Sequence, residues 1–569
     1  MRYLVLVTDY DGTIAVNGRM ADSVAAAIER LRLSGRRAIL VTGRRLEDLL
    51  PVLPQVHLFD HVVAENGAVV YEPRARRETL LGAPPPPEFI RRLRELGVDP
   101  LEVGRVVVAT RLPHHITVLR TIQETGLELH VIFNRSAVMV LPSGVNKATG
   151  MEYALRKLGL SPHEAVGIGD AENDHSFLDR CECAVAVADA APSIRKLAAF
   201  VTEGEGAEGV VEMINELIAD DLSRTHGRLE KNLIAIGARA DGTAVTVPPY
   251  GLNILIAGPS GSGKSTIAAA VAEQLMDRAY QLCIIDPEGD YGTLPEVFTL
   301  GNQSHAVTVT EVLGFLEDAK VNLNVNLLGI PLADRPLFFA QLLPNLQAMR
   351  TRTGRPHWIV MDEAHHMVPA EWSHLEKLLP HRLGETVLVT VHPDHLAPAI
   401  LSLVDLVIAV GRSPRDTLKQ VAGAIGRALE WPEGLSHRSG EVVAWFPRRG
   451  EPPFRMTATP GRAERLRHRR KYAEGDMRDC SFYFRGPRGR QNLRAQNLIV
   501  FSQIAEGVDE ETWLFHLRRG DYSRWFREAI KDKYLADQVE RIEQRQDLHP
   551  DETRTLIRSL VESRYTLPE

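Results

Sequence analysis

The chain has 569 residues, and at about 150 residues per domain this length favours about three or four domains over one compact core. Hydrophobic residues make up 44% and charged residues 25%, a balance that excludes a disordered or fibrous chain. The formal net charge of −7 is not that of a dedicated nucleic-acid binder. The few, scattered cysteines exclude a disulfide framework, and no apolar run approaches the roughly 20 residues of a membrane span. The start lacks a signal-peptide pattern, so we expect a cytoplasmic protein with no membrane partner.

Residues 1–218 alternate short apolar runs with helical patterns, and this rhythm predicts an α/β domain built on a parallel sheet. From about residue 74 to residue 142 the rhythm is interrupted by the run APPPP and by strand-like pieces, which predicts an insertion. The polar residues 219–228 then indicate a linker.

A second α/β rhythm occupies residues 229–447. It opens with two strand-like runs around Asp241-Gly242, a dipeptide typical of a β-hairpin. Residues 448–474 are rich in Arg, Gly and Pro and are expected to form a basic linker. Helical patterns in residues 475–569 predict a small, mostly helical domain.

Two aspartates follow the first strand-like run, in the sequence Asp9-Tyr10-Asp11-Gly12-Thr13. Because the carboxyl ends of parallel strands face the ligand crevice, we expect Asp9 and Asp11 at the mouth of a site. One carboxylate can attack phosphorus, and the other can protonate the leaving oxygen and then activate water. A plain turn rich in Asp and Gly is the alternative for this motif taken alone.

Three later features favour phosphate chemistry. Thr42-Gly43-Arg44 follows the strand-like AILV, so a hydroxyl and backbone N–H groups can hold a phosphate. Lys147 can neutralise a pentavalent transition state. Asp170 and Asp174 follow the strand-like AVGIG at a spacing that suits a magnesium site.

Together these residues resemble the four motifs of the haloacid-dehalogenase-like (HAD) phosphatases over about residues 1–218. The resemblance implies a Rossmann-like parallel sheet, with Asp9 as nucleophile and Asp11 as general acid and base. It implies that Thr42, Gly43 and Lys147 bind phosphate. It also implies a Mg²⁺ site, and the residues assigned to it are Asp9, Asp11 (through its backbone carbonyl), Asp170 and Asp174.

The insertion lies between the second and third motifs, where the Cof-like and sugar-phosphatase-like branch of that family carries an α/β cap. The run AENGA at residues 64–68 is also similar to that branch. The resemblance therefore implies a small sugar-phosphate-like substrate. Arg111, His114 and His115 are candidate contacts in the cap, although a solvated surface is the favoured interpretation for each.

A glycine-rich motif, G-x-x-x-x-G-K-S-T, follows the strand-like run NILIA and opens the helical run TIAAAVAEQLM. Its glycines let backbone N–H groups surround a β-phosphate at a helix N-terminus. Lys264 is expected to reach the β- and γ-phosphates, and Ser265 to bind Mg²⁺. The motif predicts an ATP site formed by Gly258, Ser260, Gly261, Ser262, Gly263, Lys264, Ser265 and Thr266.

About a hundred residues later the apolar run WIVM ends in Asp362-Glu363. We expect Asp362 to hold the Mg²⁺ shell and Glu363 to act as the catalytic residue that orients or deprotonates water. A further strand-like run ends near Thr390 and His392, where a polar side chain could sense a γ-phosphate. Ordinary hydrogen bonding at a strand end is an equal alternative for these two.

The order of hairpin, P-loop, acidic motif IIDPEGDY and DEAHH resembles the HerA/FtsK-like ATPases over about residues 229–447. The resemblance implies a RecA-like α/β domain, with Asp286 and Glu288 near the nucleotide. It also implies a homo-oligomer such as a ring, in which a neighbouring subunit supplies an arginine to the ATP site. Arg382 and Arg412 are the candidates. The glutamine usual at the sensor position is absent, because Thr390-Val391-His392 stands there.

Residues 462–494 contain eleven Lys or Arg against four Asp or Glu, interleaved with aromatic residues. This pattern suits single-stranded nucleic acid, because charges follow phosphates and rings stack on bases. The favoured alternative is a solvated linker whose aromatic side chains enter the next core. The aromatic residues concerned are Tyr472, Phe482, Tyr483 and Phe484.

The sequence therefore predicts a bifunctional enzyme, a Mg²⁺-dependent phosphomonoesterase joined to an ATPase, with a small phosphorylated substrate and ATP as ligands. The main alternative is a ring-forming ATPase that processes nucleic acid and whose phosphatase removes a phosphate from an end or a nucleotide. A nucleotide-gated scaffold with a silent phosphatase is disfavoured, because Asp9, Asp11, Lys147 and Asp170 are all present.

Overall fold

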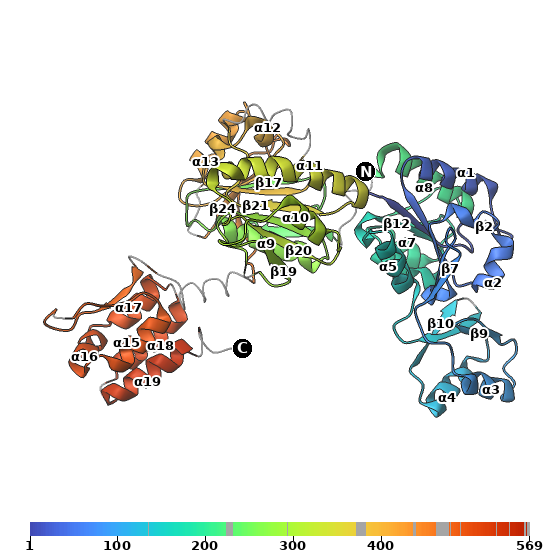
Figure 1. Cartoon of the computed structure of the whole chain (residues 1–569), viewed down its shortest axis with the longest axis horizontal. Coiled ribbons are helices and arrows are strands. Elements are labelled where there is room, and N and C mark those ends of the chain that lie inside the picture. Colours follow the sequence, from blue (N-terminus) through green and yellow to red (C-terminus); the bar gives the residue numbers. More distant parts are fainter. Residues whose placement is uncertain are drawn as a thin grey trace. The chain divides into compact units, whose positions relative to one another are not determined.

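The computed structural model describes residues 1–134, 136–223, 232–292, 294–370, 383–435, 440–462, 477, 480–489, 491–530, 532–545, 547–562 and 565. The chain divides into two compact units (Figure 1). The first holds residues 1–292 and 296–459, and the second consists mainly of residues 460–569. The helices in the described part of the chain all lack the combined length and apolarity that a membrane crossing requires.

The N-terminal domain is built on a sheet whose described strands run in the order β14-β13-β12-β1-β4-β5-β6-β7. The central strand β1 is parallel to its neighbours β12 and β4, so the carboxyl ends of all three meet at one edge. Every residue of β1 is buried, as expected for a parallel strand covered on both faces. The bounds are β1 (Val5–Thr8), β4 (Arg37–Val41), β5 (His61–Ala64), β6 (Val69–Glu72), β7 (Arg77–Leu80), β12 (Ala165–Gly169), β13 (Cys183–Ala186) and β14 (Phe200–Val201).

Helices pack on this sheet through apolar stripes of helical period. In α1 the buried residues are Val24, Ala27, Ile28 and Leu31, which lie on one face three or four residues apart. The helices are α1 (Asp22–Leu33), α2 (Leu46–Leu49), α5 (Lys147–Lys157), α6 (His175–Arg180), α7 (Pro192–Leu197) and α8 (Gly206–Asp220). Short elements between them are β2 (Ala15–Val16), β3 (Arg19–Met20), η1 (Leu50–Val52), η2 (Val56–Leu58), η3 (Glu65–Gly67), η4 (Pro162–Glu164) and η5 (Glu172–Asp174).

A separate antiparallel sheet, in the order β10-β11-β9-β8, forms the expected cap. Alternate residues of β11 face opposite sides, so Val140 packs under the cap helices while Met139 packs with Ala68 of the main domain. The cap starts later than the predicted residue 74, because β7 pairs with β6 in the main sheet. The cap elements are α3 (Pro87–Glu95), β8 (Glu102–Val103), β9 (Val108–Arg111), α4 (His115–Thr125), β10 (Leu129–Asn134) and β11 (Ala137–Pro142).

The second domain has one long sheet, whose described strands run β16-β15-β25-β24-β23-β17-β22-β21-β18-β20-β19. From β23 to β19 neighbouring strands are parallel, and the predicted hairpin β15–β16 joins the antiparallel part of the sheet. The strands are β15 (Ile234–Ala238), β16 (Ala244–Val247), β17 (Asn253–Ala257), β18 (Leu282–Asp286), β19 (Val297–Leu300), β20 (Asn322–Asn326), β21 (Trp358–Met361), β22 (Thr386–Thr390), β23 (Leu406–Ala409), β24 (Val442–Trp445) and β25 (Phe454–Ala458).

This domain extends beyond the predicted end at residue 447. The segment 448–474 was expected to be a linker, yet β25 within it pairs with both β24 and β15 and so completes the sheet. Helices and turns connect the strands: α9 (Lys264–Asp277), α10 (Val309–Leu316), η8 (Leu332–Asp334), α11 (Arg335–Thr353), η9 (Ala364–His366), η11 (Pro393–His395), α12 (Pro398–Leu401) and α13 (Pro414–Ala424).

Buried polar contacts join the two α/β domains within the first unit. His357, just before β21, donates from Nε2 to Glu164 of η4 at 2.7 Å, because its Nδ1 accepts the Gln281 N–H at 2.7 Å. Arg355 donates to the carbonyl of Gly159 at 2.7 Å. Tyr280 donates to the buried carboxylate of Glu182 at 3.2 Å. Each of these buried polar groups therefore has a partner across the domain boundary.

The second unit is the predicted small helical domain, with one hairpin of β26 (Phe482–Phe484) and β27 (Leu493–Ala495). Phe482 and Phe484 are buried and contact the ring of Phe501 in its core. Their faces are therefore not available to stack on bases. For Phe482 and Phe484 the alternative holds, in which the aromatic side chains enter the core of the next domain. Tyr472 lies outside the described residues. The helices are α15 (Leu498–Gly507), α16 (Glu510–Arg518), α17 (Asp521–Glu528), α18 (Lys533–Glu543) and α19 (Pro550–Val561).

Candidate active sites

The fold gathers four of the predicted residues at the carboxyl ends of β1 and β12. Asp9 directly follows β1, and Asp170 directly follows β12. One ligand oxygen from each of Asp9, Asp170 and Asp174 lies within 4.8 Å of the others. We call Asp9, Asp170, Asp174 and Lys147 the carboxylate cluster. All four are buried, with at most 6% of each residue exposed.

Lys147 is the cation of this cluster. Its Nζ donates to Asp9 Oδ1 at 2.5 Å and to Asp174 Oδ1 at 2.6 Å. The local sequence explains its position: Asn146 caps α5 by accepting the Thr149 N–H at 3.1 Å, which makes Lys147 the first helical residue. Burial lowers the pKa of Lys147, but the charges of Asp174 and Asp9 outweigh burial and raise it.

The cluster has more negative than positive charge. Burial and the charge of Asp174 raise the pKa of Asp9 well above its usual value, even though Lys147 opposes them. Asp174 is held by the backbone N–H groups of Asp170 and Ala171, each at 3.0 Å. Thr13 donates to Asp170 Oδ1 at 3.0 Å. Three carboxylates facing one ammonium are a donor set that fits a divalent cation.

Close packing of the first loop depends on Gly12. Its φ is +81°, and a Cβ at this position would lie 2.4 Å from Asp170 Oδ2. Any side chain at this position would therefore collide with the cluster and strain the backbone. Glycine lets the loop that carries Asp11 pass directly over Asp170.

Asp11 is the half-exposed member of the first motif. Arg44 donates to it from both Nε and Nη2, at 2.7 and 2.6 Å, in a bidentate ion pair. The hydrogen bonds that Arg44 donates to Asp11 raise the pKa of Arg44. Arg44 was expected only as a neighbour of Thr42 and Gly43, and its contact with Asp11 was missed. A charged residue directly after the second motif was the available signal.

Thr42 is buried at the end of β4, where its N–H donates to the carbonyl of Val63 and its Oγ1 accepts from the Arg44 N–H. A Cβ on Gly43 would lie 3.3 Å from Asn66 Oδ1, an oxygen that has no hydrogen-bond partner among the described residues. Asn66 and Glu65 both have positive φ, 51° and 52°. Such strain in non-glycine residues is typical of functional loops.

Glu65 connects this loop to the cap. Its carboxylate accepts the backbone N–H groups of Arg105, Val106 and Val107, each at 2.9 Å. Asn66 Nδ2 contacts the sulfur of Met139 on the cap sheet at 2.8 Å. The run AENGA therefore positions the cap over the loop that follows β5.

The three candidate cap contacts lie elsewhere. His114 and His115 begin α4, which packs on the opposite face of the cap sheet from Met139. His114 contacts the Asp99 carbonyl at 2.9 Å, and His115 packs edge-on to Phe133. Arg111 is exposed at the end of β9. None of these three is joined to the carboxylate cluster by a contact among the described residues.

The P-loop lies between buried β17 and the start of α9, as predicted. Gly258, Gly261 and Gly263 all have positive φ, which lets the loop turn back on itself. Lys264 is buried and its Nζ donates to the Pro259 carbonyl at 3.1 Å. The Ser262 hydroxyl is buried without a partner among the described residues. Ser260 is exposed, whereas Ser265 and Thr266 are half-buried in the first turn of α9.

Asp362 and Glu363 follow β21, which is separated from the P-loop strand β17 by β22 in the sheet. Burial and the charge of Glu363 raise the pKa of Asp362 to about 7. Glu363 has a φ of +41°, and its Oε2 is buried without a hydrogen-bond donor among the described residues. Burial lowers the pKa of Lys264 while the charges of Glu363 and Asp362 raise it, so the three side chains lie in one electrostatic environment.

Three other residues of this domain that the sequence suggested are Asp286, Glu288 and Thr390. Asp286 accepts the N–H groups of Asp290 and Tyr291, each at 2.9 Å, and so holds the loop after β18 in shape. Burial lowers the pKa of Lys264, and the charge of Glu288 opposes this. Thr390 Oγ1 is hydrogen-bonded to His365 Nδ1 at 3.1 Å, a partner that sequence reasoning missed.

His392 is exposed, and so is Arg412, which follows Gly411. A Cβ on Gly411 would lie 3.0 Å from Pro259, so this turn packs on the P-loop. The second arginine candidate, Arg382, lies outside the described residues.

Comparison with known proteins agrees with two separate α/β domains, because two different families match two parts of the chain. Residues 6–96 and 117–214 match the family described as haloacid dehalogenase-like hydrolase, and residues 250–401 match an AAA domain. A phosphoglycolate phosphatase of Aeropyrum pernix is 30% identical over 38% of this chain and 93% of its own length. The phosphoglycolate phosphatase of Methanothermobacter thermautotrophicus is 27% identical over 37% of this chain and 98% of its length.

A solved structure of a haloacid dehalogenase-like hydrolase from Bacteroides thetaiotaomicron is also similar. It is 18% identical, covers 38% of this chain and 99% of its own, and has a TM-score of 0.34. With a phosphatase relative matched over nearly its whole length and an AAA domain following it, the chain belongs to the haloacid dehalogenase-like hydrolases and is an enzyme with a phosphatase domain and an ATPase domain.

Proposed function

We propose that the N-terminal domain hydrolyses a phosphomonoester through an aspartyl-phosphate on Asp9. One observation carries the proposal: Lys147 bridges Asp9 and Asp174, while Asp170 lies within reach of both. The Lys147 ammonium opposes the rise in the pKa of Asp9 and aligns its carboxylate, and it is available to a phosphoryl oxygen that enters beside Asp9.

In this reaction Asp9 attacks phosphorus, and Asp11 protonates the leaving oxygen. Asp11 then takes a proton from the water that cleaves the acyl phosphate and releases inorganic phosphate. Arg44 positions Asp11 by its bidentate contact. The hydroxyl of Thr42 and the N–H of Gly43 would hold the phosphoryl oxygens opposite Lys147.

The donor set of the cluster fits Mg²⁺. Asp9, Asp170 and the backbone carbonyl of Asp11 would hold the ion, and Asp174 would support it by orienting the Asp170 loop. When bound, the ion supplies positive charge that screens the approach of two anions and stabilises the transition state.

We propose a small phosphorylated metabolite as substrate. The similar curated relatives are named as phosphoglycolate phosphatases, and the cap sheet meets the main domain through Met139 and Asn66. A cap that covers the loop after β5 favours small substrates over polymer ends. The candidates are therefore two: phosphoglycolate, a short phosphorylated acid, and the sugar phosphates that the sequence resemblance implies.

We further propose that the second domain binds and hydrolyses ATP in the manner of a HerA-like ATPase. Lys264 and the P-loop glycines would hold the phosphates, Ser265 and Asp362 would hold Mg²⁺, and Glu363 would act on water. The Ser262 hydroxyl supports this assignment, because it is buried with no hydrogen-bond partner among the described residues, and buried polar atoms normally have one.

One assay tests both activities. Phosphate release is measured from phosphoglycolate, sugar phosphates, nucleotides and 5′-phosphorylated oligonucleotides, with Mg²⁺, for wild type, Asp9→Asn and Lys264→Ala. Release from a small metabolite that is lost only in Asp9→Asn supports the proposal. Release confined to oligonucleotide ends would replace it with the nucleic-acid alternative. ATP hydrolysis is expected to disappear in Lys264→Ala and to persist in Asp9→Asn.

A further inference from the structure

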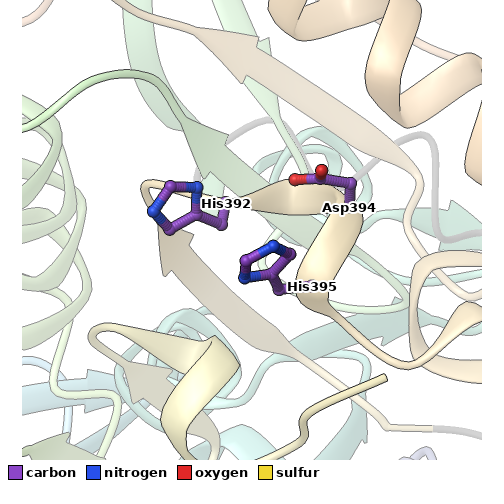
Figure 2. A group of neighbouring side chains, drawn as sticks. All are labelled: His392, Asp394 and His395. Carbon is purple, nitrogen blue, oxygen red and sulfur yellow. The ribbon is translucent and has the colours of Figure 1, made fainter. Parts of the chain in front are cut away.

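Three side chains of types that can bind metals gather in the turn after β22, whose last residue pairs with Ala257 just before the P-loop. His392 precedes η11, and Asp394 and His395 belong to it. One ligand atom from each lies within 4.8 Å of the other two. Figure 2 shows the two imidazole rings and the Asp394 carboxylate grouped at this turn. The rings are stacked, with their centroids 4.7 Å apart.

We propose that His392, Asp394 and His395 form a binding site for a divalent transition metal ion of the zinc type. Two imidazoles and one carboxylate are a ligand set that zinc and its neighbours accept, whereas Mg²⁺ and Ca²⁺ prefer oxygen alone. All three residues are exposed. Solvent can therefore complete the coordination, and an ion can enter without opening the fold.

The backbone holds the three ligands in register before any ion binds. The His392 N–H donates to Thr390 Oγ1 at 3.1 Å, and the His395 N–H donates to the His392 carbonyl at 3.1 Å. Pro393 between them is buried and restricts the turn. Ligands presented by a pre-formed turn lose less conformational entropy on binding.

The three side chains are also uncommitted. No hydrogen bond or ion pair to another described residue occupies the side chain of His392, Asp394 or His395. Exposed histidine and carboxylate side chains that have a structural role normally show such a partner, as His305 does with Glu311 at 3.1 Å. The grouping is therefore explained by a ligand better than by packing.

The site lies beside the nucleotide-binding residues and is separate from them. His365, which is hydrogen-bonded to Thr390, meets the His392 ring edge-on with centroids 5.6 Å apart. The turn thus follows the end of β22, and β22 is adjacent to β21, the strand that Asp362 follows. His392 is also one of the two strand-end residues considered for sensing a γ-phosphate, whereas Asp394 and His395 belong to neither of the proposed reactions.

The test is Zn²⁺ binding to the full-length chain in millimolar Mg²⁺, which would occupy the carboxylate cluster under the proposed function. The background variant Asp9→Asn/Lys264→Ala removes both proposed activities, so the result does not depend on them. Calorimetric titration is expected to find one tight equivalent of Zn²⁺. Bound Co²⁺ is expected to give the visible absorption of a site with few ligands. His392→Ala/His395→Ala should weaken Zn²⁺ binding by more than about tenfold, and Asp394→Asn by about tenfold.

His57→Ala/His305→Ala is the matched control, because both positions are exposed histidines outside the turn. It should bind Zn²⁺ as the parent does, and circular dichroism should show that every variant is folded. The proposal is wrong if no tight equivalent is found. It is equally wrong if the equivalent survives His392→Ala/His395→Ala or is lost instead in Asp170→Asn.

Discussion

Arg44 and Asp11 form a bidentate ion pair in which Nε and Nη2 of the guanidinium lie 2.7 and 2.6 Å from the two carboxylate oxygens. Arg44 comes from the loop after β4 and Asp11 from the loop after β1, so the pair joins two adjacent strand ends. The contact fixes the direction of the carboxylate that we assign as general acid. We therefore propose that Arg44 positions Asp11.

Arg44→Ala is expected to lower kcat for phosphomonoester hydrolysis by about tenfold, because Asp11 loses its orientation. Stability should change by less than about 1 kcal/mol, since the pair is partly exposed. The kcat of Arg44→Lys should lie between those of wild type and Arg44→Ala, because an ammonium cannot bind both carboxylate oxygens as a guanidinium does. Arg45→Ala, which removes a similar pair with Asp48, is the control and should leave kcat unchanged. Equal kcat values for Arg44→Ala and wild type would refute the positioning role.

Mg²⁺ is expected to stabilise the N-terminal domain, because the proposed Mg²⁺ site in the carboxylate cluster exists only in the folded chain. At a concentration of about 100 times Kd the gain is about 2.7 kcal/mol, visible as a higher Tm. Asp170→Asn should abolish this shift, and chelation of Mg²⁺ should abolish phosphatase activity. Glu47→Gln, which changes an exposed carboxyl, should keep the shift. A Tm shift that persists in Asp170→Asn would place the ion elsewhere.

Glu363→Gln is expected to reduce ATP turnover by about 10²- to 10³-fold, because an amide cannot accept the proton of water. Binding of ATP should persist in this variant, whereas Lys264→Ala should weaken binding itself. Phosphatase activity assayed without ATP should be unaffected in both. Glu430→Gln, at an exposed position of the same domain, controls for a general effect of charge. Full turnover in Glu363→Gln would exclude this residue as the group that acts on water.

The boundary between the two α/β domains is expected to weaken below pH 6.5. Burial lowers the pKa of His357 below its ordinary value of 6.5, although Glu164 opposes this. The unfolded chain therefore binds a proton at this residue before the folded chain does, and stability falls as the pH drops below 6.5. The loss is at most about 1.4 kcal/mol per pH unit for one group. Protonation would also break the hydrogen bond that Nδ1 accepts from the Gln281 N–H.

A second loss is expected at lower pH. Burial raises the pKa of Glu182, but the hydrogen bond and charge of His163 and the charge of Arg2 outweigh it and lower the pKa to about 2. Stability from this carboxylate is complete above its unfolded pKa of about 4.5 and is lost as the pH falls towards 2.

Thermal melts between pH 8 and pH 5 test the histidine contribution. His357→Gln should flatten the profile between pH 6.5 and pH 5, while His57→Gln should leave it as in wild type. Identical profiles for His357→Gln and wild type would show that this imidazole does not titrate on unfolding.

The motifs of both sites were predictable because each is local in the sequence. A strand that ends in Asp9-Tyr10-Asp11 and a P-loop between a strand and a helix carry their own conformational signals, in alternating apolar runs, glycines and helix caps. The hairpin at Asp241-Gly242 was likewise a local signal and is present as β15–β16. Boundaries were less predictable. The strand β7 pairs with its neighbour β6 and so belongs to the main sheet, and β25 pairs with β15, which lies far earlier in the chain.

The sequence alone determined that this chain has two α/β domains with phosphate chemistry. The period of its apolar residues and the position of its glycines are local patterns, so both are visible without the tertiary structure. Only the tertiary structure decided which side chains meet. The pairing of Arg44 with Asp11, the bridge of Lys147 between Asp9 and Asp174, and the burial of Phe482 and Phe484 each join segments whose separation in sequence gives no sign of contact. Such contacts depend on strand order and on the packing of one core, and these are set by the whole chain rather than by any local pattern.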